Sequence, residues 1–308
     1  MILEKQLSHI NNKMPKINKK QPPKSTNPDL TSLYFTSLFI GAKNSGKTYG
    51  LVKLIKNYES SPIQDADGNT LQIRTILFCP TGNSEANPVY KSLKSLDDDD
   101  IILQYSDEQL NDKIMEIQQD KEDIVDSKAY LIAWKRFMRV QEVERLSNED
   151  IITLSKYHFM EPEAIPKPKY KYPPVIFLIL DDLIGSNDCF KKGNSLISNL
   201  TIKHRHLGIN IIYTTQNPKS IPNIIRNNID IFVLYKFANT KMVLEKIYEE
   251  CSAFLTEEQF EELYMHAVKE PHNALVIDTH PATINENRIK KNFEIVLSLN
   301  GNEPASNY

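Results

Sequence analysis

The strongest chemical signal in the sequence is a run of residues that matches the pattern G-x-x-x-x-G-K-[ST]. The run consists of Gly41, Ala42, Lys43, Asn44, Ser45, Gly46, Lys47 and Thr48. This pattern predicts a phosphate-binding loop, in which backbone N–H groups converge on the β and γ phosphates and the two glycines adopt angles that a Cβ atom would obstruct. Lys47 is expected to reach the β and γ oxygens, and the Thr48 hydroxyl to ligate Mg²⁺. The run therefore predicts a bound nucleoside triphosphate; the alternative is an ordinary glycine turn before a helix.

A pair of carboxylates follows a continuous apolar run further along the chain. Residues 175–180 are Val-Ile-Phe-Leu-Ile-Leu, and Asp181 and Asp182 come directly after them. Such a run is typical of a central parallel strand that is buried on both faces. We expect Asp181 to lie near the Mg²⁺ through a coordinated water, and Asp182 to polarise the water that attacks the γ phosphate. Because an apolar strand followed by Asp is common, this interpretation depends on the phosphate-binding loop upstream.

A polar amide ends the next apolar run, which covers residues 209–215. At the tip of a strand beside the Asp181 strand, Gln216 is placed to contact both the γ phosphate and the attacking water, and so to couple hydrolysis to movement. A glutamine at a strand end is otherwise a cap. The ordered series of motifs favours the sensor role for Gln216.

The elements that must position these residues follow from the apolar pattern. A phosphate-binding loop requires a strand before it and a helix after it, and the sequence predicts a strand over 37–40 and a helix over 48–58. Further strands are predicted over 75–79, 101–105, 175–180, 209–215, 229–235 and 273–278, and further helices over 240–251 and 256–269. Apolar strands interleaved with helices predict an α/β fold with a mainly parallel central sheet that helices cover on both faces.

Composition divides the chain into a core and several extensions. We predict a flexible basic N-terminal arm over 1–32, a core domain over 33–285 and a peripheral C-terminal tail over 286–308. Within the core, apolar residues at helical spacing predict a helical insertion over about 107–160. A high proline content predicts an extended linker over 161–174.

Two smaller features have more than one interpretation. The aspartates at 97–100 are expected to form an exposed, strand-breaking loop, because consecutive residues on one loop rarely converge on one metal ion. Tyr170 and Tyr172 alternate with lysines in the proline-rich linker. They belong to a surface segment, and base stacking is the functional alternative.

The composition is that of a globular protein. A chain of 308 residues with 40% hydrophobic content can bury a substantial core, and a net charge of -3 argues against a uniformly basic nucleic-acid-binding protein. Cys79, Cys189 and Cys251 are too few and too widely spaced for a disulfide framework or a Cys-x-x-Cys metal site, which points to a reducing compartment. No apolar run is long enough to span a membrane, so we expect a soluble protein that is not secreted.

Taken in order, the motifs resemble those of the FtsK/HerA superfamily of DNA-pumping ATPases. Besides the phosphate-binding loop and the Asp pair, the resemblance rests on Arg-His-Leu-Gly-Ile at 205–209, Thr-Thr-Gln-Asn-Pro at 214–218 and Ile-Pro-Asn-Ile-Ile-Arg-Asn-Asn at 221–228. Within the superfamily, residues 34–280 most resemble the genome-packaging ATPases of large double-stranded DNA viruses and virophages, the poxvirus-type packaging proteins. Many members of the wider superfamily have Asp-Glu at the second motif. The Asp pair of this chain is a departure that the packaging branch accommodates.

The resemblance implies a RecA-like P-loop NTPase core that hydrolyses ATP, with Mg²⁺ as cofactor, and moves double-stranded DNA into a preformed capsid. It further implies a homo-oligomeric ring, a pentamer or hexamer, that contacts capsid vertex or portal components. The resemblance also implies that the protein is located in the host cytoplasm or a viral factory and is associated with the virion.

The resemblance also implies roles for particular cations. Arg205 is placed to reach the γ phosphate of a neighbouring subunit, where a guanidinium stabilises charge on the transferring phosphoryl group. A basic helix end is the structural alternative for Arg205, and Arg226 is a second candidate for the same role. Lys191, Lys192 and Lys203 are candidates for lining a DNA channel.

Other functions remain open from the sequence alone. The first alternative is a different P-loop enzyme, such as a viral helicase or a small-molecule kinase. The second is a nucleotide-dependent scaffold that acts in capsid assembly and hydrolyses ATP poorly.

Overall fold

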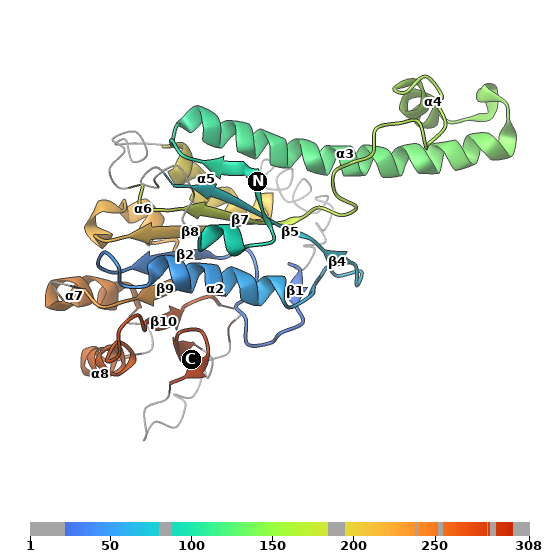
Figure 1. Ribbon diagram of the computed structural model, residues 1–308. Helices are drawn as coiled ribbons and strands as arrows, with labels where there is room; N and C mark the ends of the chain where they lie inside the picture. Colours follow the sequence, from blue (N-terminus) through green and yellow to red (C-terminus); the bar gives the residue numbers. More distant parts are fainter. Residues whose placement is uncertain are drawn as a thin grey trace, which may run out of the picture.

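The computed structural model describes residues 22–79, 88–183, 195–237, 240–251, 255–281, 283 and 288–297. Their centre is a nine-stranded sheet in the order β12-β11-β10-β9-β2-β8-β7-β5-β6 (Figure 1). The strands are β2 Thr36–Ile40, β5 Ile73–Phe78, β6 Leu96–Ile102, β7 Val175–Leu180, β8 Ile209–Thr215, β9 Ile231–Leu234, β10 Leu275–Asp278, β11 Ile289–Lys291 and β12 Ile295–Val296. A smaller three-stranded sheet contains β1 Lys24–Ser25, β3 Ile63–Gln64 and β4 Thr70–Leu71.

The large sheet is parallel from β9 to β6 and antiparallel at its other end. Strand β2 pairs in parallel with both β8 and β9, and β7 pairs in parallel with β8 and β5. Strands β10, β11 and β12 continue the sheet in antiparallel pairs. The fold class predicted from the sequence, a RecA-like α/β fold with a mainly parallel central sheet between helices, is confirmed.

Helices cover both faces of this sheet. They are α2 Lys47–Glu59, α3 Asp107–Val140, α4 Asn148–Ser155, α5 Leu196–Leu207, α6 Asn223–Arg226, α7 Thr240–Cys251 and α8 Glu257–Ala267. One face packs against α2 through residues such as Leu51, and the other packs against α3, α5 and α8 through residues such as Leu200 and Phe260. Every residue of β7 is buried, with alternate side chains entering the two cores. A strand covered on both faces must be apolar throughout, which explains the continuous run in its sequence.

Helix α3 is longer than the sheet that it packs on. It has 34 residues, about 50 Å at 1.5 Å per residue. Its first half packs on the sheet through Leu110 and Ile117. Its second half projects past the sheet with α4 beside it (Figure 1) and forms a separate small core with Tyr130, Leu154 and Ile165. We call residues 121–165, the projecting part of α3 together with α4, the arm.

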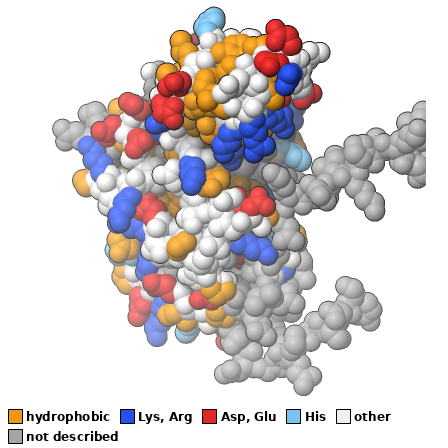
Figure 2. Space-filling model, turned by 90° about the vertical axis from the view of Figure 1, so that its right-hand side faces the viewer, with side chains coloured by type: hydrophobic (Ala, Val, Ile, Leu, Met, Phe, Trp, Pro, Cys, Tyr) orange, Lys and Arg blue, Asp and Glu red, His pale blue; other side chains and the backbone are white. Residues whose placement is uncertain are grey.

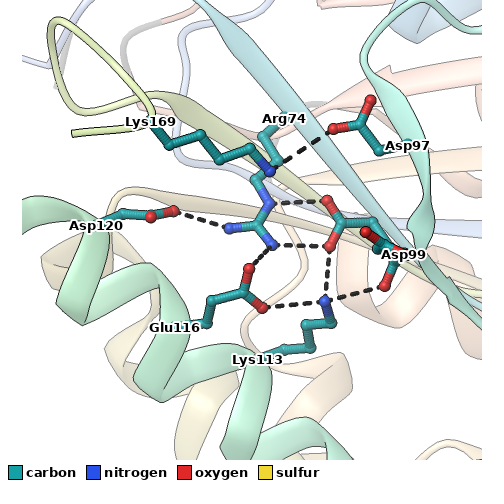
Figure 3. A network of polar contacts seen from close by, with 8 residues as sticks. Arg74, Asp97, Asp99, Lys113, Glu116, Asp120 and Lys169 are labelled. Atoms are coloured by element: carbon teal, nitrogen blue, oxygen red, sulfur yellow. Dashed lines mark hydrogen bonds and ion pairs between the residues drawn. The ribbon is translucent and has the colours of Figure 1, made fainter. Parts of the chain in front are cut away.

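The aspartates at 97–100 do not form the strand-breaking loop that the sequence suggested. They lie within β6, which begins at Leu96 rather than at residue 101. The first three are exposed, but Asp100 is 1% exposed and accepts hydrogen bonds from Arg74 of β5 at 2.8 and 2.7 Å. A strand can bury a carboxylate when a cation is buried beside it. Figure 3 shows this Arg74 network, to which Lys113, Glu116 and Asp120 of α3 also belong.

Both ends of the described chain are tied to the fold. Residues 1–21 of the predicted N-terminal segment lie outside the described residues. The part that follows contacts the core: β1 pairs with β3, and Tyr58 Oη donates to the Thr31 carbonyl at 2.6 Å. Residues 24–31 of that segment therefore contact the folded core. Lys290 of β11 donates to the Asp29 carbonyl at 2.6 Å, which joins the two ends of the described chain. Among the described residues, no helix has both the length and the apolarity that a membrane span needs.

Candidate active site

The three predicted chemical motifs meet at one edge of the sheet. Strands β2, β7 and β8 are parallel neighbours, so their carboxyl ends lie together, with Ile40 opposite Thr215 and Leu180 opposite Tyr213. The Gly41 N–H donates to the Thr215 carbonyl at 3.2 Å. The phosphate-binding loop, the Asp pair and Gln216 all follow directly from these strand ends.

The loop over 41–48 has the backbone geometry that its glycines predict. Gly46 has a φ of 105°, in the region that glycine favours, and caps α2 without a side-chain hydrogen bond. A Cβ atom on Gly41 would lie 2.5 Å from Ser45 Oγ and 2.6 Å from Tyr235 Cβ. The first turn of α2 contains no acidic residue. Its free N–H groups and the helix dipole therefore favour an anion at this end of α2.

Lys47 lies folded against the loop. Its Nζ donates to the carbonyls of Gly41 at 2.8 Å and Ala42 at 3.0 Å. Burial lowers the pKa of Lys47, and the nearby carboxylates of Asp182 and Asp181 oppose that shift. The cation and the two predicted carboxylates thus share one electrostatic environment.

Hydrogen bonds join the Asp pair to Thr214 and to Gln216. The Thr214 hydroxyl donates to Asp181 Oδ1 at 2.5 Å and accepts from the Asp182 N–H at 3.0 Å. Gln216 Nε2 donates to Asp182 Oδ2 at 3.1 Å. Asp182 has a φ of 49°, which is strained for a residue with a side chain and is found at sites where the backbone must aim a functional group.

The residues around the loop fit a nucleoside triphosphate. A cavity of about 530 Å³ lies over the loop and is lined by Asn44, Ser45, Gly46, Lys47, Thr48, Tyr49, Val89 and His272. Ser45 Oγ is buried there with no hydrogen-bond partner among the described residues. A buried hydroxyl without a partner is costly, and a phosphate oxygen at the loop would satisfy it. Thr48 and Asp181 supply the oxygen donors that suit Mg²⁺.

Sequence reasoning missed several residues of this site. His272 precedes β10 in a turn at the same sheet edge, and a Cβ atom on Gly46 would lie 3.2 Å from His272 Cβ. Val89 and the adjacent Tyr90 follow β5. None of these residues belongs to a local motif, because an antiparallel strand or a separate loop brings each of them to the edge.

The polar partners of Arg205 and Arg226 among the described residues do not include these site residues. Arg205 is near the end of α5 and donates to Asp230 Oδ1 at 2.7 Å. Asp230 also accepts a hydrogen bond from the N–H of Thr36, which is the first residue of β2. Arg205 is therefore at the opposite edge of the sheet from the phosphate-binding loop. Arg226 forms an ion pair with Glu250 at 3.5 Å. Contact of either arginine with the site of another subunit stays a prediction.

The contact between α2 and Tyr235 predicts an unusual effect of a helix substitution. Ala in a helix interior is normally more stable than Gly by about 1 kcal/mol. A Cβ atom on Gly50 would lie 1.9 Å from Tyr235 Oη, and Tyr235 is 2% exposed, so the ring would have to shift within a packed core. We expect Gly50→Ala to lower the free energy of unfolding by about 1–3 kcal/mol in urea titrations. Adding Tyr235→Phe should recover most of the loss; a stabilising Gly50→Ala would contradict this packing.

Comparison with known proteins gives structural neighbours only. No model of a known protein family matches the chain, and no curated protein matches it in sequence. The DNA-packaging ATPase B204 from Sulfolobus turreted icosahedral virus superposes with a TM-score of 0.42 and 15% identity, over 86% of this chain and 98% of its own. B204 from Sulfolobus turreted icosahedral virus 2, in complex with AMP, superposes with a TM-score of 0.43 and 15% identity, over 86% of this chain and 98% of its own. EssC (ATPases 2 and 3) from Geobacillus thermodenitrificans superposes with a TM-score of 0.40 and 17% identity, over 79% of this chain and 37% of its own.

Proposed function

We propose that this protein is an ATPase that moves double-stranded DNA into a viral capsid. The observation that carries the ATPase part is the meeting of Lys47, the Asp pair and Gln216 at one sheet edge, around a loop with free helix N–H groups. An anion site, a cation and a hydrogen-bonded carboxylate are the parts that phosphoryl transfer to water requires.

Each residue has a distinct task in this proposal. The N–H groups of the loop and Lys47 hold the phosphates, and Lys47 leaves its loop carbonyls to do so. Thr48 and Asp181 would hold Mg²⁺, which neutralises charge on the phosphates. Asp182 accepts the proton of the attacking water, and the Gln216 amide holds the Asp182 carboxylate in place. Asp182 has a left-handed backbone conformation directly after the buried strand β7.

The DNA part of the proposal is supported by the charge of the arm. Residues 127–140 of α3 contain Lys128, Lys135, Arg136 and Arg139 and no acidic residue. Lys128 lies about three turns beyond Ile117, so the side of α3 that packs on the sheet continues into the arm as a basic, exposed face. Figure 2 shows a band of Lys and Arg side chains below the apolar end of the arm.

The linker over 161–174 adds cations next to this face. Lys128 Nζ and Lys171 Nζ lie 4.8 and 5.3 Å from the centre of the Tyr172 ring. Tyr170, in contrast, is 8% exposed, so it is part of the packed structure and the base-stacking alternative is wrong for this residue. Arg136 pairs with Asp150 at 2.9 Å, whereas Lys128, Lys135 and Arg139 form no ion pair among the described residues. Cations without carboxylates beside them suit the phosphate backbone of DNA, and a translocase that moves any sequence needs only backbone contacts. The ring, the capsid contacts and the viral location belong to the same proposal and rest on the sequence resemblance.

The basic face gives a direct test of the DNA part. In the triple variant Lys128→Gln, Lys135→Gln, Arg139→Gln, we expect ATP turnover without DNA to be unchanged and stimulation by linear duplex DNA to be lost. The slope of log affinity against log salt should fall by about 2–3, because each lost phosphate contact reduces it by about 0.9. Fluorescence anisotropy with a labelled duplex measures the affinity. The matched control replaces three other lysines with Gln: Lys56, Lys91 and Lys94. These lysines are exposed on the side of the sheet that α2 covers.

The outcomes also separate the alternatives. Equal DNA affinity in both triple variants would place the DNA contact elsewhere. Strand displacement on a forked substrate would favour a helicase. Nucleotide binding without turnover, with or without DNA, would favour the assembly scaffold.

A further inference from the structure

Tyr90 has a buried hydroxyl that the packing of the described residues does not use. It begins a short 3-10 helix, Tyr90–Ser92, and is 1% exposed. Its Oη forms no hydrogen bond of good geometry with the described residues, although the Asp181 carboxylate and the Thr48 hydroxyl lie near it. Burying a hydroxyl without a well-formed hydrogen bond is unfavourable, and Phe would fill the same space without that cost. A ligand that is held at this point is a reason for the hydroxyl to be present.

The surroundings of Tyr90 show where the hydroxyl is directed. Its ring packs in the core between α2 and the sheet, together with Val52 and Cys79. Cys79 Sγ donates to Asp181 Oδ2 at 3.4 Å, and Val89, the residue before Tyr90, lines the cavity together with Thr48. The ring therefore approaches the cavity from the side where the Asp181 carboxylate and Thr48 meet.

The electrostatics agree with this placement. Burial raises the pKa of Tyr90 well above its ordinary value, the Asp181 carboxylate raises it further, and the Thr48 hydroxyl lowers it. Apart from burial, the groups that shift this pKa are Asp181, Cys79 and Thr48. The Asp181 carboxylate and the Thr48 hydroxyl therefore both lie close to the Tyr90 hydroxyl.

We propose that Tyr90 is a positioning residue for a divalent cation held between Thr48 and Asp181. The Tyr90 hydroxyl donates a hydrogen bond to an oxygen ligand of that cation, which is a water or a carboxylate. The inference rests on the proposed nucleotide site. A donor at this point would orient the carboxylate or water that Mg²⁺ requires for octahedral coordination. The hydroxyl forms no well-directed hydrogen bond to the residues alone, and oxygen ligands ordered around a cation would accept one, so it favours the cation-bound nucleotide over the free nucleotide.

The test is Tyr90→Phe, with calorimetric titration of the non-hydrolysable analogue AMPPNP in EDTA and at increasing MgCl₂. We expect the affinity in EDTA to be unchanged and the gain in affinity that Mg²⁺ gives to fall by about tenfold, the loss of one hydrogen bond to a charged group. The melting temperature of the variant without ligand should be equal to or higher than that of the parent protein, because an unsatisfied hydroxyl is removed. Tyr130→Phe is the control: Tyr130 Oη donates to the Met160 carbonyl at 2.5 Å in the arm, so this variant should melt lower and keep the full Mg²⁺ effect.

Three results would overturn the inference. A lower melting temperature of Tyr90→Phe with an unchanged Mg²⁺ effect would make the hydroxyl a purely structural group. An equal loss of AMPPNP affinity with and without Mg²⁺ would place its contact on the phosphates. A full Mg²⁺ effect with an unchanged melting temperature would mean that it has no role at the site. If the parent protein itself binds no AMPPNP, the proposed nucleotide site fails, which is distinguishable from a failure at Tyr90 alone.

Discussion

Asp182→Asn is expected to lower the rate of ATP turnover by about 10³-fold while the protein still binds ATP. An amide cannot accept the proton of the attacking water, and general base catalysis contributes about 10²–10⁴-fold. Binding should persist because the loop N–H groups and Lys47 are untouched, and because removing a negative charge near the phosphates does not weaken an anion site. Single-turnover hydrolysis and equilibrium binding of a fluorescent ATP analogue measure the two quantities separately.

Two comparison variants sharpen this test. Asp98→Asn makes the same chemical change at an exposed position of β6 and should leave turnover unchanged. Lys47→Ala should lower both binding and turnover, because it removes the cation from the loop. Turnover of Asp182→Asn within tenfold of the parent protein would remove Asp182 as the base. If DNA or capsid binding also persisted, the scaffold alternative would gain support.

The parts of the site that the sequence predicted are those encoded by local pattern. The runs over 175–180 and 209–215 are strands with those bounds because a strand buried on both faces requires unbroken apolar character, which is visible in one segment. The loop over 41–48 is likewise recognisable alone, because its glycines serve backbone angles within the loop. Once the strands are parallel neighbours, Asp181 and Gln216 must lie at the same edge.

The features that the sequence did not reveal depend on partners that are distant along the chain. His272 reaches the loop only because β10 runs antiparallel to β9 and so starts at the phosphate edge. Tyr90 reaches Asp181 from a separate loop after β5. The aspartate run lies in a strand and not in a loop because Arg74, on the preceding strand, stabilises the buried Asp100 carboxylate. No window of local sequence contains both members of such a pair.

Arg74→Ala is expected to lower the free energy of unfolding by about 3–5 kcal/mol, the cost of leaving a buried carboxylate without its cation. Arg74 and Asp100 are each 1% exposed in their side chains, and Arg74 also contacts Glu116 at 2.7 Å and Asp120 at 2.9 Å. These carboxylates belong to α3, so the network joins α3 to β5 and β6 (Figure 3). Guanidinium chloride unfolding, followed by circular dichroism, measures the change. The loosened α3 should also expose the arm to limited proteolysis.

The dependence of this effect on pH identifies its origin. Burial alone would raise the pKa of Asp100, but hydrogen bonds from Arg74 and Lys113 outweigh it and hold that pKa below its ordinary value. A carboxylate with a lowered pKa in the folded state stabilises the protein above its unfolded pKa, about 3.9, and loses this contribution as the pH falls through the folded value. Asp120 has a pKa raised chiefly by burial, so it opposes this trend. The difference between the parent protein and Arg74→Ala should thus be full at pH 7 and shrink below about pH 4.

A paired substitution separates the cost of an unpaired charge from the loss of packing. The double variant Arg74→Met, Asp100→Leu replaces both buried charges with apolar side chains, and such replacements of buried ion pairs are often neutral or stabilising. Lys113 keeps Glu116, at 3.0 Å, as its partner. We therefore expect the double variant to be more stable than Arg74→Ala by at least about 2 kcal/mol. If both variants lose the same stability at every pH, the contribution of Arg74 lies in its packing volume, and the ion network has no net effect on folding.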